Sequence, residues 1–226
     1  MTCPDAPPPP DTEVQLAVPT PVVTPPFPEV IRTGQPGAVV PISEEFDSAQ
    51  GFIQTSDNVY IEGGQVNWRI QRNGGVQYVY RSIPPFGGNV RLTAQGQVDS
   101  WTNNCDVRAG IGQGPGIGLE LKFGWTGGGC PTQGVQIDAI GVTLDRAEND
   151  CHFTGNWLWV ESSTSYTAEL TIVDGAATLA VEGVGSVSGE VEYEGPYTTL
   201  WVGNTGRGDW PECSGKIDSM MIEPLD

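Results

Sequence analysis

The sequence has few positive charges and a single histidine. Its 226 residues include 10 Lys and Arg against 28 Asp and Glu, which gives a formal charge of −18. A chain this acidic repels phosphate backbones and anionic lipid surfaces, which excludes nucleic acid as a partner and argues against membrane surfaces. Chemistry that needs several imidazoles is excluded as well. No apolar run approaches the roughly 20 residues of a membrane span, and no signal peptide is visible.

Cysteine is scarce too, and none of the five residues forms a C-x-x-C pair. Cys105, Cys130, Cys151 and Cys213 all lie in or beside turn-like sequence, which predicts two disulfides and an extracellular or cell-surface location. Three pairings are open, and we favour Cys105–Cys130 with Cys151–Cys213. The alternative is four buried thiols in a cytosolic protein. Cys3 precedes a proline-rich stretch, as in bacterial lipoproteins, so its lipidation stays open.

Proline is concentrated at one end of the chain. Residues 1–41 hold twelve of the 19 prolines, so we expect an extended arm or stiff linker there. Within it, Val14, Leu16 and Val18 alternate on one face of an extended chain. Such a stripe fits a segment that adds as a strand to the open sheet edge of another copy. The alternatives are a plain spacer and an arm that folds back on its own domain.

From residue 42 onward the chain reads as short alternating strands. Residues 117–125 alternate without a break, and we see no apolar stripe of helical period. Asn73-Gly74-Gly75 predicts a hairpin between strands at 66–70 and 76–80, and Asp174-Gly175 predicts a second hairpin. More than a dozen strands in this length predict an all-β fold, a two-sheet antiparallel jelly-roll sandwich over residues 42–226.

The last quarter carries a more specific pattern. A strand over 166–175 ends in Asp-Gly, a hairpin follows, and then come a Leu-x-Val-Gly strand at 200–203 and a closing Gly-x-Ile-Asp strand at 215–222. This order resembles the C-terminal half of the concanavalin A-like, laminin-G-like jelly rolls. The resemblance implies a lectin-like sandwich whose closing strand pairs with the first strand, here around residues 46–53.

A row of glutamates and a series of glycines are the first candidates for function. Glu190, Glu192 and Glu194 alternate on one strand face, which is similar to the E-x-D-x-E strand of some jelly-roll endoglucanases. The same pattern fits the solvent face of an amphipathic strand, and we predict no glycosidase activity from it. The glycines at alternate positions from 110 to 118 indicate a flexible loop, or a strand with one bare face.

Calcium and glycans are the candidate ligands. The family resemblance brings Asp47 near Asp218, which predicts a structural Ca²⁺ site, although unbound surface acids are the alternative. Asp145, Glu148 and Asp150 crowd one loop and form a second candidate cluster. Trp125 and Trp210 lie in loop sequence, where exposed rings would stack on sugars.

These observations favour a non-enzymatic extracellular structural protein. In this interpretation, copies of the chain assemble through the arm into a surface filament, tube or layer. The alternatives are a glycan-binding, lectin-like adhesion module on a proline-rich stalk, and a glycoside hydrolase using the Glu190/Glu192/Glu194 strand.

Overall fold

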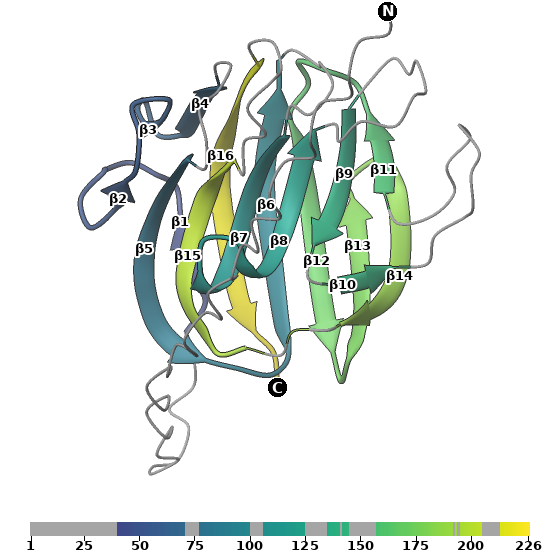
Figure 1. The fold of residues 1–226 in the computed structure, drawn as a ribbon. Coiled ribbons are helices and arrows are strands. Elements are labelled where there is room, and N and C mark those ends of the chain that lie inside the picture. The colour runs from purple at the N-terminus through teal and green to yellow at the C-terminus, as the bar shows by residue number, and fades with distance from the viewer. Residues whose placement is uncertain are drawn as a thin grey trace, which may run out of the picture. The chain divides into compact units, whose positions relative to one another are not determined.

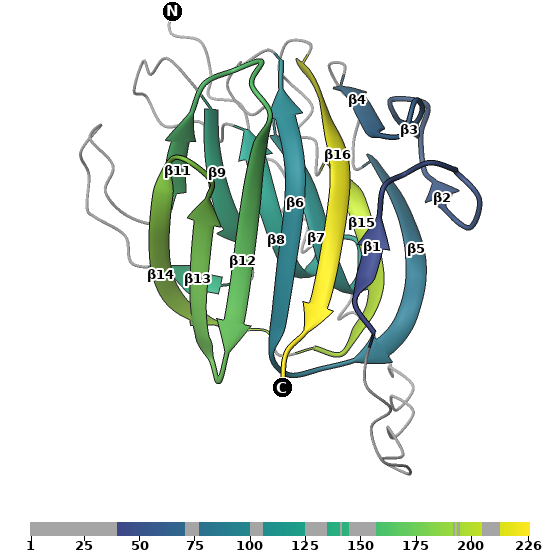
Figure 2. The ribbon, with the colours of Figure 1, turned by 180° about the vertical axis from the view of Figure 1, so that it is seen from behind.

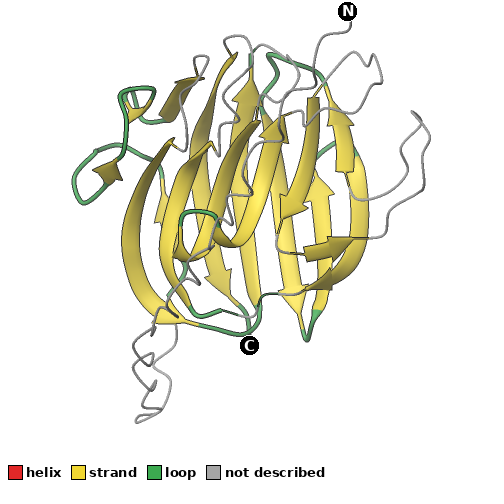
Figure 3. Ribbon diagram, viewed as in Figure 1, coloured by secondary structure: helices red, strands yellow, loops and turns green. Residues whose placement is uncertain are grey.

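The described part of the chain is built of strands and turns. A computed structural model describes residues 40–70, 77–99, 106–124, 135–140, 142–144, 157–191, 193, 195–204 and 213–226. These residues form strands and their connections, and they include no helix (Figure 3). The chain divides into Met1–Gly37 and Ala38–Asp226, and the described residues all belong to the second unit.

The strands form two antiparallel sheets. Sheet A has nine strands and sheet B has seven. Sheet A runs in the order β10 (Val142–Leu144), β14 (Gly185–Val191), β13 (Ala176–Val181), β12 (Tyr166–Val173), β6 (Val90–Val98), β16 (Cys213–Pro224), β4 (Val66–Ile70) and β3 (Val59–Ile61), with β1 (Ile42–Glu44) also on β16. Sheet B runs β11 (Trp157–Val160), β9 (Val135–Ile140), β8 (Ile117–Gly124), β7 (Asp106–Gly114), β15 (Tyr197–Asn204), β5 (Gln77–Phe86) and β2 (Ile53–Gln54).

The core lies between the two sheets. Figure 1 views the sandwich from the side of sheet B, and Figure 2 views it from the side of sheet A. The central strands bury apolar side chains on one face: Leu92 and Leu170 are fully buried from sheet A, as are Leu119 and Val202 from sheet B, and all belong to one cluster. The predicted two-sheet sandwich with all-β structure is therefore confirmed. We call the face of each sheet turned away from this core its outer face.

The hairpin at Asp174-Gly175 is confirmed, whereas the one at Asn73-Gly74-Gly75 is wrong. Strands β12 and β13 pair through a tight turn in which Asp174 and Gly175 have φ of 50° and 82°. Strand β4 instead pairs with β3 and β16, and β5 pairs with β15 and β2 in the other sheet. The prediction failed because alternation and a turn motif do not say which sheet receives the next strand.

The closing strand does pair with the first strand, but at an earlier position than expected. β16 pairs with β1, so that Ile42 lies opposite Ile222, and residues 46–53 are not its partner. After β1 the chain crosses to sheet B and adds β2 to β5. Phe46 is fully buried with a φ of 53°, a left-handed conformation that turns the chain out of β1 and ends the strand. We call residues 42–54 the strap.

Candidate functional site

The outer face of sheet B carries charged side chains on its central strands. In β8, Leu119 and Leu121 enter the core, and Glu120 and Lys122 alternate with them onto the outer face. Both charged side chains are nevertheless buried, with 2% and 4% of their surface exposed. Burying a charge is costly unless it is paired, so these positions need specific partners.

Glu120 has two such partners on neighbouring strands. Its Oε2 is 3.0 Å from Nη1 of Arg108 on β7, and its Oε1 accepts a 2.9 Å hydrogen bond from Nε1 of Trp201 on β15. Trp201 is fully buried although it lies outside the core cluster. The Arg108 side chain keeps 16% of its surface exposed. The three residues form a polar cluster with fixed contacts. Within it, part of the Arg108 side chain still reaches the surface.

Bare glycines make room for this cluster. Gly110 lies between Trp201 and Glu120 in the register of β15, β7 and β8. A Cβ at Gly110 would come within 2.4 Å of Cε2 of Trp201, so the indole lies flat across the glycine. Gly203 receives the ring of Tyr78 in the same way, at 2.2 Å. The interpretation of alternate glycines as a strand with one bare face is confirmed for β7, and the flexible-loop alternative is wrong there.

The β7–β8 hairpin bends toward β5. A Cβ at Gly116, in its turn, would lie 3.5 Å from the Tyr78 hydroxyl, and the Gly112 carbonyl accepts a 3.2 Å bond from Oγ1 of Thr198. Gln113 hydrogen-bonds to Tyr193. Burial raises the pKa of the Tyr193 phenol above its usual value, against the opposing effect of the bonds from Gln113. The hairpin thus frames one end of the outer face.

The predicted carboxylate strand lies elsewhere. Glu190 is exposed near the end of β14 in sheet A, opposite Thr143 and Ala176, while Val191 packs against the core. This placement agrees with the solvent-face interpretation of that strand. Glu192 and Glu194 lie outside the described residues.

The proposed calcium ligands lie in the described part, but the structure gives Asp218 other partners. Its Oδ1 is 3.0 Å from Nζ of Lys216, and its Oδ2 accepts a 3.2 Å bond from Ser165. Asp47 is exposed in the strap. Within the described ranges, no three His, Cys, Asp or Glu side chains gather closely enough to hold a metal. The calcium site stays a prediction, and the cluster at Asp145, Glu148 and Asp150 lies outside these ranges.

The other predicted sites also fall outside the described ranges. These are Val14, Leu16 and Val18 of the arm, Trp125 and Trp210, and three of the cysteines, Cys105, Cys130 and Cys151. Cys213 opens β16 opposite Ile70. The disulfides and the assembly stripe therefore stay predictions.

Sequence reasoning missed the cluster of Arg108, Glu120 and Trp201. A signal was present, because Glu120 and Lys122 occupy intervening positions of the apolar alternation over residues 117–125 and so place two charges on one face of that strand. What the pattern lacks is the partner, since Trp201 is 81 positions from Glu120 along the chain.

Comparisons with known proteins identify the fold. No protein-family model and no curated protein sequence matches the chain. Among solved structures, the Crh5 transglycosylase in complex with NAG is similar over 84% of this chain and 86% of its own, with a TM-score of 0.54 and 14% identity. A prokaryotic β-1,3-1,4-glucanase (lichenase) from a mouse hindgut metagenome matches over 82% and 99%, with a TM-score of 0.52 and 12% identity.

A sialidase structure is similar over 78% of this chain, with a TM-score of 0.54 and 13% identity, and there the chain spans only 17% of the larger protein. The protein is thus a concanavalin A-like jelly-roll sandwich, the fold of lectins and glucanases, as its C-terminal motifs predicted. None of its described segments is a helix long and apolar enough to cross a bilayer.

Proposed function

We propose that this protein binds carbohydrate on the outer face of sheet B. The observation that carries the proposal is the buried cluster of Arg108, Glu120 and Trp201, which stands on the side of the sheet away from the core. An ion pair buried at such a place adds little net stability, and we take its position on this face as support for a recognition site. The likeness to a transglycosylase and a glucanase supports a glycan as the ligand.

The chemistry of the face suits a sugar. Arg108 presents guanidinium donors whose direction is fixed by Glu120, and donors of fixed geometry discriminate among hydroxyl or carboxylate acceptors. Tyr80 lies next to Trp201 in the register and is half-buried, so part of its ring is available for stacking. Ser82 and Thr199 form a pair two positions along the same strands and add hydroxyls.

Binding without turnover is the first form of the proposal. Both oxygens of Glu120 are already engaged, one by Arg108 and one by Trp201, which leaves the carboxylate poorly placed to exchange a proton with a substrate. Among the described side chains of this face, Glu120 is the one carboxylate. Glycoside hydrolysis normally uses two.

Hydrolysis of a glycoside is the second candidate function, because the strand register brings a second acidic residue near Glu120. Asp138 of β9 lies opposite Lys122, and Glu120 lies opposite Ile140, so the two acids are diagonal neighbours on adjacent strands. Diagonal positions on adjacent antiparallel strands lie about 7 to 8 Å apart along the backbone, and glycoside hydrolysis normally uses a pair of carboxylates on neighbouring positions of one face. Reducing ends released from a β-glucan, and lost in both Glu120→Gln and Asp138→Asn, would establish this candidate.

The test of binding is titration of the full chain with mixed-linkage β-glucan and chitin oligosaccharides. We expect Tyr80→Ala to weaken binding about tenfold, the equivalent of about 1.4 kcal/mol. Thr178→Ala, an exposed change on the outer face of β13 in sheet A, is the control. Equal affinities for wild type and Tyr80→Ala, with both proteins folded, would contradict the assignment of this face.

A further inference from the structure

The outer face of sheet A carries a row of polar side chains that runs across its strands. Asn67 of β4 lies opposite both Tyr60 of β3 and Lys216 of β16, and Lys216 in turn lies opposite Gln97 of β6. Adjacent strands are about 4.8 Å apart, so these four positions span about 14 Å. We call Tyr60, Asn67, Lys216 and Gln97 the polar row.

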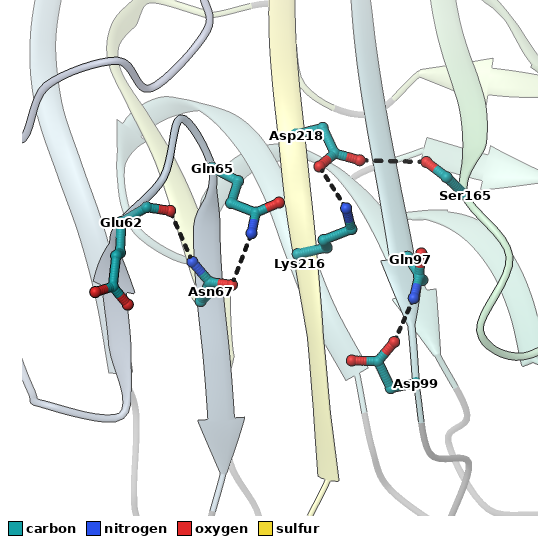
Figure 4. A network of polar contacts seen from close by, with 8 residues as sticks. All are labelled: Glu62, Gln65, Asn67, Gln97, Asp99, Ser165, Lys216 and Asp218. Carbon is teal, nitrogen blue, oxygen red and sulfur yellow. Dashed lines mark hydrogen bonds and ion pairs between the residues drawn. The ribbon is translucent and has the colours of Figure 1, made fainter.

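Contacts with neighbouring groups hold Asn67, Lys216 and Gln97 of the row in place (Figure 4). Nδ2 of Asn67 donates to the Glu62 carbonyl at 3.1 Å, and its Oδ1 accepts from Nε2 of Gln65 at 3.2 Å. Nζ of Lys216 pairs with Asp218. These contacts order side chains that would otherwise lose rotamer freedom when a ligand binds, which lowers the cost of association.

A contact with a loop extends the network beyond β16. Ser165, just before β12, donates to Asp218 from the far side, and Gln97 donates from Nε2 to Asp99. Figure 4 shows these groups spread over neighbouring strands on one face. The four members of the polar row are all half-buried, so each keeps part of its surface open to a ligand.

We infer that the polar row is a second glycan-binding surface, which takes a neutral, extended polysaccharide lying across the strands. Amide and ammonium groups repeated at the strand spacing match a chain that presents hydroxyls at regular intervals. Tyr60 closes the row on β3 with an aromatic ring of the kind that stacks on a sugar. The carboxylates of Asp99 and Asp218 beside the row, in a chain of charge −18, disfavour a polyanion.

This inference rests on the proposed function in one respect only, which is that the ligand is a glycan. The two outer faces point in opposite directions from the core, as the views from either side show (Figures 1 and 2). A protein with a site on each face holds two glycan chains at once and bridges them. Bridging is a property that a protein with one site does not have.

The experiment uses the full chain and two probes. Titration calorimetry with a mixed-linkage β-glucan tetrasaccharide counts the sites, and light scattering with the β-glucan polymer reports bridging. The row variant is Tyr60→Ala combined with Asn67→Ala, and the sheet B variant is Tyr80→Ala. Thr178→Ala, exposed on the same outer face but outside the row, is the matched control. Thermal melts confirm that each variant is folded.

We expect two sites in wild type and in Thr178→Ala. The row variant should retain one site and lose bridging, with at least a tenfold loss of affinity at the altered site. If the row variant abolishes all binding while Tyr80→Ala changes nothing, the row is correct and the sheet B proposal fails. A row variant that binds two tetrasaccharides and bridges like wild type overturns the inference. Preferential binding of polygalacturonate at the row overturns the neutral-chain assignment.

Discussion

At the scale of single residues, Gly110 shows how a missing side chain creates a site. Trp201 could not lie flat against β7, and so could not reach Glu120, if residue 110 carried a Cβ. Gly114, on the same strand, has nothing within 4 Å of the position where a Cβ would lie. The two glycines look alike in the sequence but differ in what they make possible.

We predict that Gly110→Ala destabilises the fold by about 1 to 3 kcal/mol, because Trp201 must move to admit the methyl group. Gly114→Ala is the matched control and should change stability much less. Urea unfolding measures both, and the fluorescence of Trp201 should shift only in Gly110→Ala. Equal midpoints for the two variants would mean that the indole does not depend on the bare glycine.

Tyr193 makes stability depend on pH in the alkaline range. Burial raises the pKa of its phenol above 10.0, so above pH 10 the unfolded chain loses this proton before the folded one does. Folding stability must therefore fall as pH rises past 10. Tyr193→Phe should show a flatter decline of the unfolding midpoint between pH 9 and 11 than wild type. An identical slope in the two proteins would rule out this residue as the source.

At the scale of elements, the strap joins the two sheets at the side where β3 and β2 are the outermost strands. Glu44 of β1 pairs with Arg81 of β5 through Oε2 at 2.7 Å, and its Oε1 accepts the backbone N–H of Phe46 at 3.0 Å. The Arg81 guanidinium lies 5.4 Å from the ring centre of Phe52. One carboxylate thus links sheet A, sheet B and the turn between them.

We predict that Arg81→Met lowers stability by about 1 kcal/mol and loosens β1 first, since the Glu44 carboxylate loses its partner on the other sheet. Hydrogen exchange should then speed up in the strap more than in the rest of sheet A. Arg91→Met, which removes an arginine paired with Glu169 and Glu223 on one exposed face, is the control. Faster exchange in both variants alike would argue against a special role for the strap.

The strap also separates the parts of the fold that the sequence predicts from those that it does not. The Asp-Gly hairpin was predictable because its residues lie close together in the chain, and the closing strand was predictable from the family resemblance that its own Gly-x-Ile-Asp motif carries. The position of the first strand was not predictable. Strand β1 is only three residues long, and the left-handed conformation of Phe46 turns the chain away just after it. Likewise, the charges on β8 were visible but their partner Trp201 was not, since β15 reaches β7 only through the topology of sheet B.

At the scale of the whole molecule, the excess of acidic residues favours the binding of a cation. With a formal charge of −18, a bound cation would relieve repulsion and stabilise the folded state by mass action. We predict that excess chelator lowers the melting temperature, and that Asp47→Asn together with Asp218→Asn removes the effect. Because Asp218 pairs with Lys216, the ion must compete with that contact. An unchanged melting curve in chelator would remove the calcium site.

Assembly through the arm has a direct test. If Val14, Leu16 and Val18 add to a sheet edge of another copy, deleting residues 1–31 should leave a folded monomer, whereas the full chain forms larger species. Burial of the three side chains would contribute roughly 5 to 8 kcal/mol before the costs of association. Light scattering measures the difference. Equal size distributions for the two proteins would show that the arm does not drive assembly.

The pairing of β1 with β16 has a mechanical consequence. Ile42 lies opposite Ile222 and the strands run antiparallel, so the chain enters and leaves the sandwich at the same end of this pair. A load applied between those two ends meets the ladder hydrogen bonds one after another, as in a zipper, instead of all together in shear. The sandwich should therefore open at low force from its own ends, beginning at Ile42, while a pull along the length of β16 would meet every bond of the strand at once.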